Sequence, residues 1–214
     1  MKILVFDTET TGLPIGKNPS IITTHLWPHI VQLSYILYDT EHQTILEYTD
    51  VIIKLPKGVY ISKESENIHR ISNAISQEQG VDIINELKLF NDILLKADIV
   101  IAHNISFDKN MIMVECIRNK VQQNFTVNNN RKQEYCSMKN SVNICKIVVK
   151  GRNGDYFKYP KLIELHKHLF DTVPNGLHNS MVDVLACLRC YGKMELNVDF
   201  LEQSDSVKML YDRF

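Results

Sequence analysis

Three short apolar segments open the chain, and they constrain its fold more than any later feature. Residues 2–6 form an apolar run that ends at Asp7, while residues 30–38 and 44–54 partly alternate apolar and polar side chains on either side of a turn-like DTEHQ stretch. An apolar run of this length is typical of a buried strand, and two alternating segments joined by a turn predict a hairpin. The chain is therefore expected to begin with three strands.

Beyond residue 60 the apolar residues recur at helical spacing. Helices are expected over residues 62–71, 81–95, 106–118, 159–169, 180–196 and 200–214, the fourth with Pro160 near its first turn. A buried strand is expected at residues 98–102, an Asn-rich loop at 122–132, and either a helix or a strand at 141–149. Strands followed by alternating strands and helices predict the α/β class, with a mixed sheet and helices packed on its faces.

Size and overall charge bound the possible functions. The 214 residues and the hydrophobic content of 44% suffice for the core of one domain, so a single domain over residues 1–214 is expected. Lys and Arg total 24 against 25 Asp and Glu, which gives no bulk electrostatic reason to expect a polyanionic partner. Any contact with nucleic acid must therefore be local.

Two regions stand out from this neutral background. Residues 131–161 hold eight basic and two acidic residues, a local charge of +6. They form either a solvated loop with solvated helix faces or a flank that follows phosphates. Residues 14–27 contain Pro14 and Pro19, and Pro28 follows, so we expect a long loop without regular structure there.

Cysteine usage and the N-terminus indicate a soluble protein of a reducing compartment, the cytoplasm or the nucleus. The five cysteines are irregularly spaced, which does not suggest a disulfide framework, and Cys187 and Cys190 are expected to be buried helical thiols rather than zinc ligands. The apolar start of the chain is too short for a signal peptide, and no stretch approaches the ~20 apolar residues of a membrane span.

Asp7 and Glu9 are the first residues that could carry chemistry. Residues two apart in a strand point to the same face, so both carboxylates would project together from the strand end. Adjacent carboxylates repel unless a cation compensates their charge, and oxygen-only ligands suit Mg²⁺ or Mn²⁺. Gly12 just beyond them permits a tight turn. Taken alone, however, an Asp-x-Glu after a strand is more often structural than functional.

Two further acidic residues stand near expected helix starts. Asp108 falls in a first helical turn, where the helix dipole favours a carboxylate. Asp183 follows His178 by five residues, and the two side chains converge only if His178 lies in the loop before the helix, with Asn179 or Ser180 as the cap. Each of these residues alone could simply stabilise or cap a helix.

The combination is more informative than its parts. Three segments each present a carboxylate at a strand end or a helix start, and the carboxyl ends of strands are where α/β sheets place their sites. Two metal ions roughly 4 Å apart could clamp the attacking and leaving oxygens of a phosphodiester displacement. Convergence of these carboxylates in space is the condition for such a site.

The stretches FDTETTGL, AHNISFD and HNSMVD resemble, in order and rough spacing, the three motifs of the DEDDh superfamily of proofreading-type 3′→5′ exonucleases. Residues 28–33, 67–71 and 136–139 resemble the family's second strand, its IHGI segment and the strand after the second motif. The similarity runs from residue 2 to about residue 194, before a helical tail at about 199–214. It is strongest to the epsilon proofreading subunit of bacterial DNA polymerase III and its free-standing relatives.

This resemblance implies an RNase H-like fold with an N-terminal antiparallel three-strand portion and helices on both faces of the sheet. It also implies that two divalent cations, Mg²⁺ or Mn²⁺, are held by Asp7, Glu9, Asp108 and Asp183, and that His178 is the general base. By the same resemblance, Asp7 bridges both ions, Glu9 and Asp183 serve the ion that activates water, and Asp108 holds the other ion.

The resemblance further implies residues that contact the substrate. Thr10 and Thr11 are expected near the terminal nucleotide, and Leu13 is expected to wedge against its base. The pocket floor is expected to be shaped by His103, Asn104 and Phe107. Stacking against any base would make binding sequence-tolerant. Plain packing or turn formation is the alternative for all six.

Three functions remain open. The first is a 3′→5′ exonuclease that acts on the free 3′ end of DNA, either free-standing or with a DNA polymerase as partner. The second keeps the chemistry and acts on RNA or short oligonucleotides. The third is a catalytically silent nucleic-acid-binding or assembly module, which would have no need of all five catalytic candidates.

Overall fold

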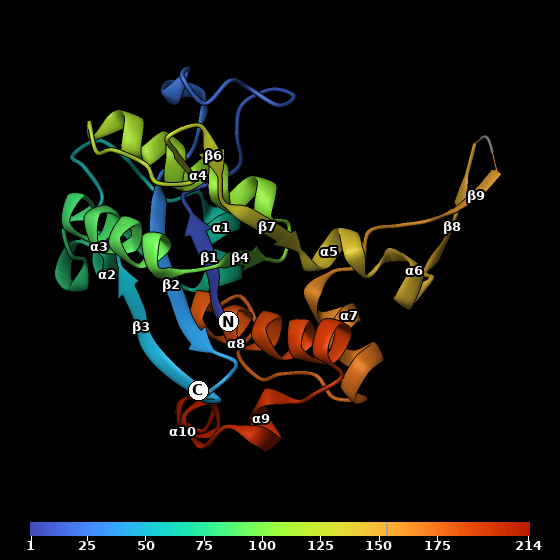
Figure 1. The fold of residues 1–214 in the computed structure, drawn as a ribbon. Helices are drawn as coiled ribbons and strands as arrows, with labels where there is room; N and C mark the ends of the chain where they lie inside the picture. The colour runs from blue at the N-terminus through green and yellow to red at the C-terminus, as the bar shows by residue number, and fades with distance from the viewer. Residues whose placement is uncertain (153) are drawn as a thin grey trace.

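The computed structural model describes residues 1–152 and 154–214, and its centre is a five-stranded mixed sheet (Figure 1). The strand order is β3-β2-β1-β4-β7. β1 pairs antiparallel with β2 and parallel with β4, β2 pairs antiparallel with β3, and β4 pairs parallel with β7. The five strands are Lys2–Thr10 (β1), Ile30–Asp39 (β2), Thr44–Ile52 (β3), Ile99–Ala102 (β4) and Gln133–Cys136 (β7). The expected mixed sheet with an antiparallel three-strand start is confirmed.

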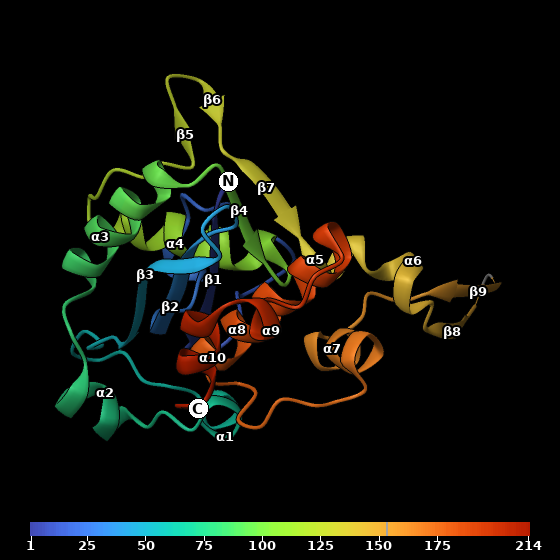
Figure 2. The same ribbon diagram turned by 60° about the horizontal axis from the view of Figure 1, so that its bottom comes forward.

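Helices cover both faces of this sheet, as the resemblance implied (Figures 1 and 2). One face packs against α3 (Ile83–Lys96) and α4 (Ile105–Arg118), and the other against α8 (Ser180–Tyr191). Side chains of β1 alternate between the two cores: Leu4 and Phe6 face α3 and α4, whereas Ile3 and Val5 face α8. This alternation decides which helix each later residue of β1 meets.

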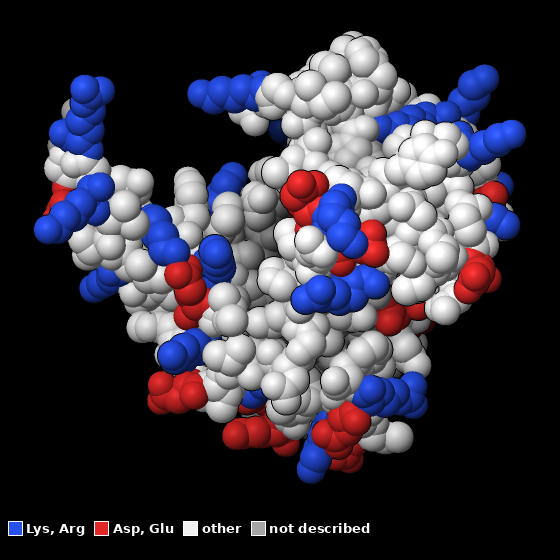
Figure 3. Space-filling view, turned by 180° about the vertical axis from the view of Figure 1, so that it is seen from behind, with Lys and Arg blue, Asp and Glu red and all other residues white. Residues whose placement is uncertain are grey.

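The remaining elements are short and surround the sheet. They are η1 (Thr24–Leu26), α1 (Lys63–His69), α2 (Asn73–Gln79), β5 (Thr126–Val127), β6 (Asn130–Arg131), α5 (Ser137–Asn140), α6 (Val142–Cys145), β8 (Val148–Gly151), β9 (Gly154–Phe157), α7 (Leu162–Phe170), η2 (Gly192–Leu196), α9 (Phe200–Gln203) and α10 (Asp205–Tyr211). β8 and β9 form a separate antiparallel ribbon that stands away from the body, and a hollow separates it from the rest of the surface (Figure 3). Over the described part of the chain, none of the helices combines the length and apolar character of a bilayer span.

Several expected boundaries were wrong. The first strand does not end at Phe6 but continues to Thr10, because β2 keeps pairing with it: Asp7 lies opposite Ser34 and Glu9 opposite Gln32. Residues 137–139 form the start of α5, not a strand, since the strand of this region ends at Cys136. The expected helix at 180–196 changes to a π-helical turn after Tyr191.

Other differences arise from local capping that periodicity does not reveal. α2 was not expected; it is capped by Ser72, whose side chain accepts a hydrogen bond from the Ile75 amide. The expected tail helix is two helices, because Ser204 ends α9 and caps α10. The expected loop at 122–132 contains the small β5–β6 hairpin, and the ambiguous segment at 141–149 is a helix and then the start of a strand.

The long loop between β1 and β2 is anchored by one arginine of α4. The Arg118 guanidinium donates hydrogen bonds to the carbonyl oxygens of Thr24 (2.6 Å) and Pro28 (2.7 Å), and to that of Trp27. It also pairs with the carboxylate of Glu115 at 2.6 Å, which is 3% exposed. The loop is irregular apart from η1, as expected, yet its end is tied to the core.

Replacing Arg118 with Met should therefore destabilise the protein by about 3–5 kcal/mol, because the Glu115 carboxylate would stay buried without its cation. Urea unfolding measures this change. Lys96→Met breaks a pair with Glu47 whose two side chains are about half exposed, and should change stability by no more than about 1 kcal/mol. Equal small losses in both variants would contradict the anchoring role.

Candidate active site

Asp7 and Glu9 lie on the face of the sheet that α8 covers. They continue the row of Ile3 and Val5, because every second residue of β1 points to that face. β2 has a register irregularity opposite the Glu9–Thr10 step, so the strand end is locally distorted just beyond the two carboxylates. Strand periodicity alone thus directs both side chains toward one helix start.

The start of α8 brings the third carboxylate to them. Asn179 caps the helix by accepting a hydrogen bond from the Met181 amide, and Asp183 lies in the first turn. The Ser180 hydroxyl donates to the Asp7 carbonyl oxygen at 2.8 Å, which fastens the helix start to β1. As a result, Asp7, Glu9 and Asp183 each place an oxygen atom within 4.8 Å of the others.

Asp108 approaches from the opposite side of β1. It lies in the first turn of α4, and its Oδ1 accepts hydrogen bonds from the Thr8 amide (3.1 Å) and the Thr8 hydroxyl (2.9 Å). Thr8 points to the α4 face because it falls between Asp7 and Glu9 on the strand. Asp108 is 3% exposed and stands beside the three-carboxylate group rather than within it.

Burial raises the pKa of all four acids, and neighbouring carboxylates raise it further for three of them. Burial raises the pKa of Asp7 to about 7. Burial and the charge of Asp7 raise the pKa of Asp183 to about 8, and burial with the neighbouring carboxylates raises that of Glu9 to about 9. The pKa of Asp108 is also raised, by burial and by Asp7. Without a cation, the cluster cannot hold its full negative charge near neutral pH.

The chemistry of these atoms fits a divalent cation. Asp183 Oδ1 is buried and has no hydrogen-bond partner among residues 1–152 and 154–214, which is costly for a carboxylate oxygen. Asp7 and Glu9 supply further oxygen ligands beside it, and Mg²⁺ and Mn²⁺ prefer oxygen ligands. Asp7, Glu9 and Asp183 are the residues that would hold such an ion.

His178 lies in the loop immediately before α8, as convergence with Asp183 requires. Its backbone is left-handed, with φ at 71°, and its amide donates to Asp183 Oδ2 at 3.3 Å. The side chain is exposed. The imidazole is thus attached next to the carboxylate cluster on a segment open to solvent.

A cleft of about 570 Å³ adjoins this cluster. It is lined by Thr8, Glu9, Thr10, Gly12, Leu13, Ser62, Glu64, Ser65, Ile68, His69 and Phe107. Leu13 is 82% exposed at its rim. The Thr10 hydroxyl donates to the Gly12 carbonyl oxygen (2.7 Å), and Thr11 accepts from the His29 amide (3.0 Å), so both threonines shape the turn after β1.

Comparison with known proteins assigns this arrangement to a family. A family model described as an exonuclease matches residues 4–191. The chain belongs to the exonuclease family. This family consists of nucleases, which are phosphodiester hydrolases. The three-carboxylate group and the neighbouring Asp108 come from the three stretches that resemble exonuclease motifs.

Solved structures support the fold assignment of this exonuclease. A structure of E. coli exonuclease I in complex with a dT13 oligonucleotide superposes with a TM-score of 0.68 at 14% identity, over 92% of this chain and 42% of that one. The zinc-bound form of the E. coli exonuclease I complex with single-stranded DNA gives a TM-score of 0.67 at 14% identity, over 99% and 42%. The exonuclease thus spans less than half the length of these proteins, and no curated protein sequence matches it.

Some residues expected near the substrate have other contacts in the exonuclease. Thr11, His103 and Asn104 do not belong to the lining of the cleft within the described residues. His103 lies between two groups: Nε2 meets the Pro160 carbonyl oxygen at 3.0 Å and Nδ1 meets the Ser137 hydroxyl at 2.9 Å. The carbonyl can only accept, so Nε2 carries the proton, and burial lowers the pKa of His103 to about 4.

α1 supplies cleft residues to which sequence reasoning gave no role. Ser62, Ser65, Ile68 and His69 line the cleft opposite β1. His69 is buried, and its Nε2 lies 3.3 Å from the Thr10 carbonyl oxygen, which joins α1 to the turn after β1. The signal was present in the segment at 67–71, whose resemblance to the IHGI segment could have pointed to this wall.

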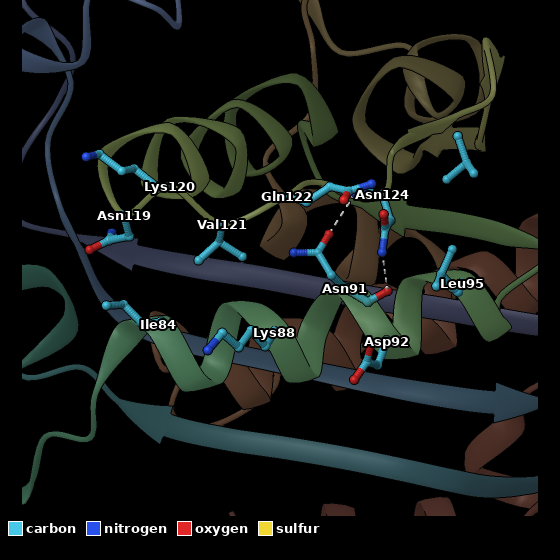
Figure 4. Close-up of a pocket in the computed structure, with 11 residues that line it drawn as sticks. Ile84, Lys88, Asn91, Asp92, Leu95, Asn119, Lys120, Val121, Gln122 and Asn124 are labelled. Atoms are coloured by element: carbon cyan, nitrogen blue, oxygen red, sulfur yellow. Dashed lines mark hydrogen bonds between the residues drawn. The ribbon is translucent and has the colours of Figure 1, made fainter.

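A second hollow, of about 640 Å³, lies between α3 and the end of α4 (Figure 4). The buried Asn91 side chain accepts a hydrogen bond from the Asn124 amide (2.8 Å), and the Asn124 side chain donates to the Asn91 carbonyl oxygen (3.2 Å). These contacts fasten the chain after α4 to α3. The elements that carry the four carboxylates do not line this hollow, apart from the end of α4, so it is a structural feature rather than part of the active site.

The raised pKa values predict how stability depends on pH when metal is chelated. The native state binds more protons than the unfolded state between the ordinary carboxyl pKa values near 4 and the raised values of about 7 to 9. The free energy of unfolding is therefore highest at the acidic end of this window and falls as pH rises through it. Thermal unfolding in chelator across the window should show a falling Tm, and added Mg²⁺ or Mn²⁺ should reverse the fall.

Glu9→Gln should raise the Tm at the alkaline end of this window by at least about 2–4 °C, the equivalent of about 1 kcal/mol. Glu202→Gln removes one exposed carboxylate of α9 and should leave the pH profile unchanged. A wild-type profile that is flat in chelator, or equally shifted by the two variants, would contradict the buried carboxylates as its cause.

Proposed function

We propose that this exonuclease hydrolyses the phosphodiester bond at the 3′ end of DNA and releases nucleoside monophosphates in the 3′→5′ direction. The observation that carries the proposal is the group formed by Asp7, Glu9 and Asp183, with oxygens within 4.8 Å and with Asp183 Oδ1 buried and unpaired in the part of the chain that the structure describes. A module that only binds nucleic acid has no need of such a group, because carboxylates repel phosphates.

Two divalent cations, Mg²⁺ or Mn²⁺, complete the proposed site. Bound there, such ions polarise the scissile phosphate and lower the pKa of water. Asp7 would serve both ions, because its oxygen lies close to those of Glu9 and Asp183 and its charge also raises the pKa of Asp108. The Oδ1 of Asp108 is engaged by Thr8, which leaves its other oxygen for a second ion, directly or through water.

His178 is the proposed general base. It stands outside the buried cluster, on the loop that enters α8, where an imidazole can take a proton from the attacking water and release it to solvent. The hydrogen bond from its amide to Asp183 fixes the loop relative to the carboxylates. The proton acceptor and the metal ligands are therefore held by one helix start.

The cleft beside Glu9 is the proposed place of the terminal nucleotide. Leu13 and Ile68 are exposed apolar side chains at this cleft and can stack against either face of a base, while Phe107 contributes to its wall. Such contacts are insensitive to base identity. The E. coli exonuclease I structures were determined with single-stranded DNA, which supports a single DNA strand as the substrate class.

His178→Ala should lower kcat by about 10²- to 10⁴-fold on a 3′-terminal DNA substrate, the usual effect of losing a general base. Binding of Mn²⁺, followed by calorimetry, should persist. His168→Ala makes the same chemical change at an exposed position of α7 and should retain full activity. A His178→Ala variant with the wild-type rate would remove the histidine from the mechanism.

Asp7→Asn should abolish both hydrolysis and cation binding, because Asp7 lies between all the other carboxylates. The direct test is a comparison of end-labelled single-stranded DNA, duplex DNA and RNA, each with Mg²⁺ and with chelator. Release of mononucleotides from the 3′ end in Mg²⁺ alone is expected, with DNA degraded faster than RNA. A faster reaction on RNA would reassign the substrate, and an active Asp7→Asn variant would overturn the mechanism.

A further inference from the structure

The ribbon formed by β8 and β9 has no role in the site described above. With its flanking residues it forms an arm, described over residues 146–152 and 154–161, that stands clear of the body in two views (Figures 1 and 2). Val148 pairs with Phe157 and Lys150 with Asp155, so the two strands pair with each other, and neither joins the central sheet. A two-stranded ribbon alone is only marginally stable in water.

The arm is strongly basic in a chain of nearly neutral charge. It contains five Lys or Arg residues and one acidic residue, Asp155, a net charge of +4, whereas the whole chain has −1, which leaves −5 for the remainder. Lys158 pairs with Glu164 at 2.6 Å. Within the described residues, the other four cations of the arm form no ion pair: Lys146, Lys150, Arg152 and Lys161.

Aromatic side chains accompany these cations on the same arm. Tyr156 is 56% exposed, Phe157 44% and Tyr159 59%. Tyr156 and Phe157 are adjacent on β9, so they lie on opposite faces of the ribbon, and neither face has a hydrophobic core to fill. Unpaired cations repel one another, and phosphates would neutralise them. Exposed rings remain hydrated, and unstacked bases would stack against them.

The chain segment that contains the arm is tied to His103, close to the active site. His103 binds the Ser137 hydroxyl, which precedes the arm at the start of α5, and the Pro160 carbonyl oxygen at the arm's far end. His103 itself follows β4 directly, at the junction from which α4 carries Phe107 and Asp108. One imidazole thus joins the start of α5 and the far end of the arm to the junction that carries Asp108, and Figure 3 shows the hollow between the arm and the body.

We propose that this arm binds the single nucleic acid strand that continues away from the 3′-terminal nucleotide, with Lys146, Lys150 and Arg152 on its phosphates and the exposed tyrosines against its bases. This inference rests on the proposed exonuclease function. Each strand of the ribbon is about 13 Å long, at about 3.3 Å per residue. Because none of the arm residues lines the cleft beside Glu9, the arm would contact nucleotides upstream of the terminal one, and its effect depends on substrate length.

The test is a triple variant, Lys146→Gln, Lys150→Gln and Arg152→Gln. Binding of a fluorescent single-stranded oligonucleotide of about 16 nucleotides is measured in chelator, where hydrolysis cannot interfere, at several salt concentrations. Each lost phosphate contact lowers the slope of log K against log salt by about 0.7 for a single strand, so the slope should fall by about 2 and the affinity by tenfold or more at low salt.

A matched control separates a specific arm from a general charge effect. Lys88→Gln, Lys120→Gln and Lys208→Gln make the same charge change at exposed positions outside the arm. An equal loss of affinity in both triple variants would overturn the proposal. An arm variant that still binds single strands and loses only duplex binding would overturn it as well. Tyr159→Leu, outside the paired strands, should weaken single-strand binding without changing the salt slope.

Hydrolysis then distinguishes failure of the arm from failure of the proposed function. The arm variant should cleave a dinucleotide as fast as wild type and the long oligonucleotide at least tenfold more slowly at low enzyme concentration. Equal rates on both substrates would overturn the arm while leaving the exonuclease intact. A wild-type protein that cleaves neither substrate would refute the exonuclease function, and the binding measurements in chelator would still decide the role of the arm.

Discussion

Repulsion among buried carboxylates is the constraint on which the rest of the structure depends. Asp7, Glu9 and Asp183 approach within 4.8 Å, and burial raises the pKa of each. Such a group cannot hold itself together, so neutral contacts of the backbone must do so. β1 is paired on both sides, and Ser180 ties the start of α8 to the Asp7 carbonyl. A bound cation would compensate this burial and repulsion and let the carboxylates ionise near neutral pH.

The sequence predicted those parts of the fold and site that follow from periodicity. Alternation in β1 sets Asp7 and Glu9 on one face, and a helix beginning near residue 180 sets Asp183 above them, so their convergence could be expected before any coordinates. The side from which Asp108 approaches could not, because it depends on which face of the sheet α4 covers, and tertiary packing decides that. The end of β1 was missed for a related reason: continued pairing with β2 outweighs the polar character of residues 7–10.

Residues fixed by distant partners were the least predictable. His103 was expected at the floor of a nucleotide pocket, yet its ring contacts Ser137 and Pro160, 34 and 57 residues away. Neither partner has a local signature, and the β8–β9 ribbon between them has no core to give it an amphipathic pattern. The basic composition of residues 131–161 was visible in the sequence, but composition alone does not distinguish a solvated surface from a projecting arm.

Two separate anchors therefore hold the regions that extend beyond the central sheet and its covering helices. Arg118 of α4 holds the loop after β1 by binding its carbonyl oxygens, and His103 before α4 holds the start of α5 and the far end of the arm. Arg118 is the last residue of α4 and His103 lies just before its start, so both anchors belong to the ends of the helix that carries Asp108. Because neither anchor contributes a ligand to the carboxylate cluster, loop and arm can change in sequence and length while the cluster keeps its geometry. On this proposal, contacts with the nucleic acid beyond its terminal nucleotide vary independently of the chemistry at that nucleotide.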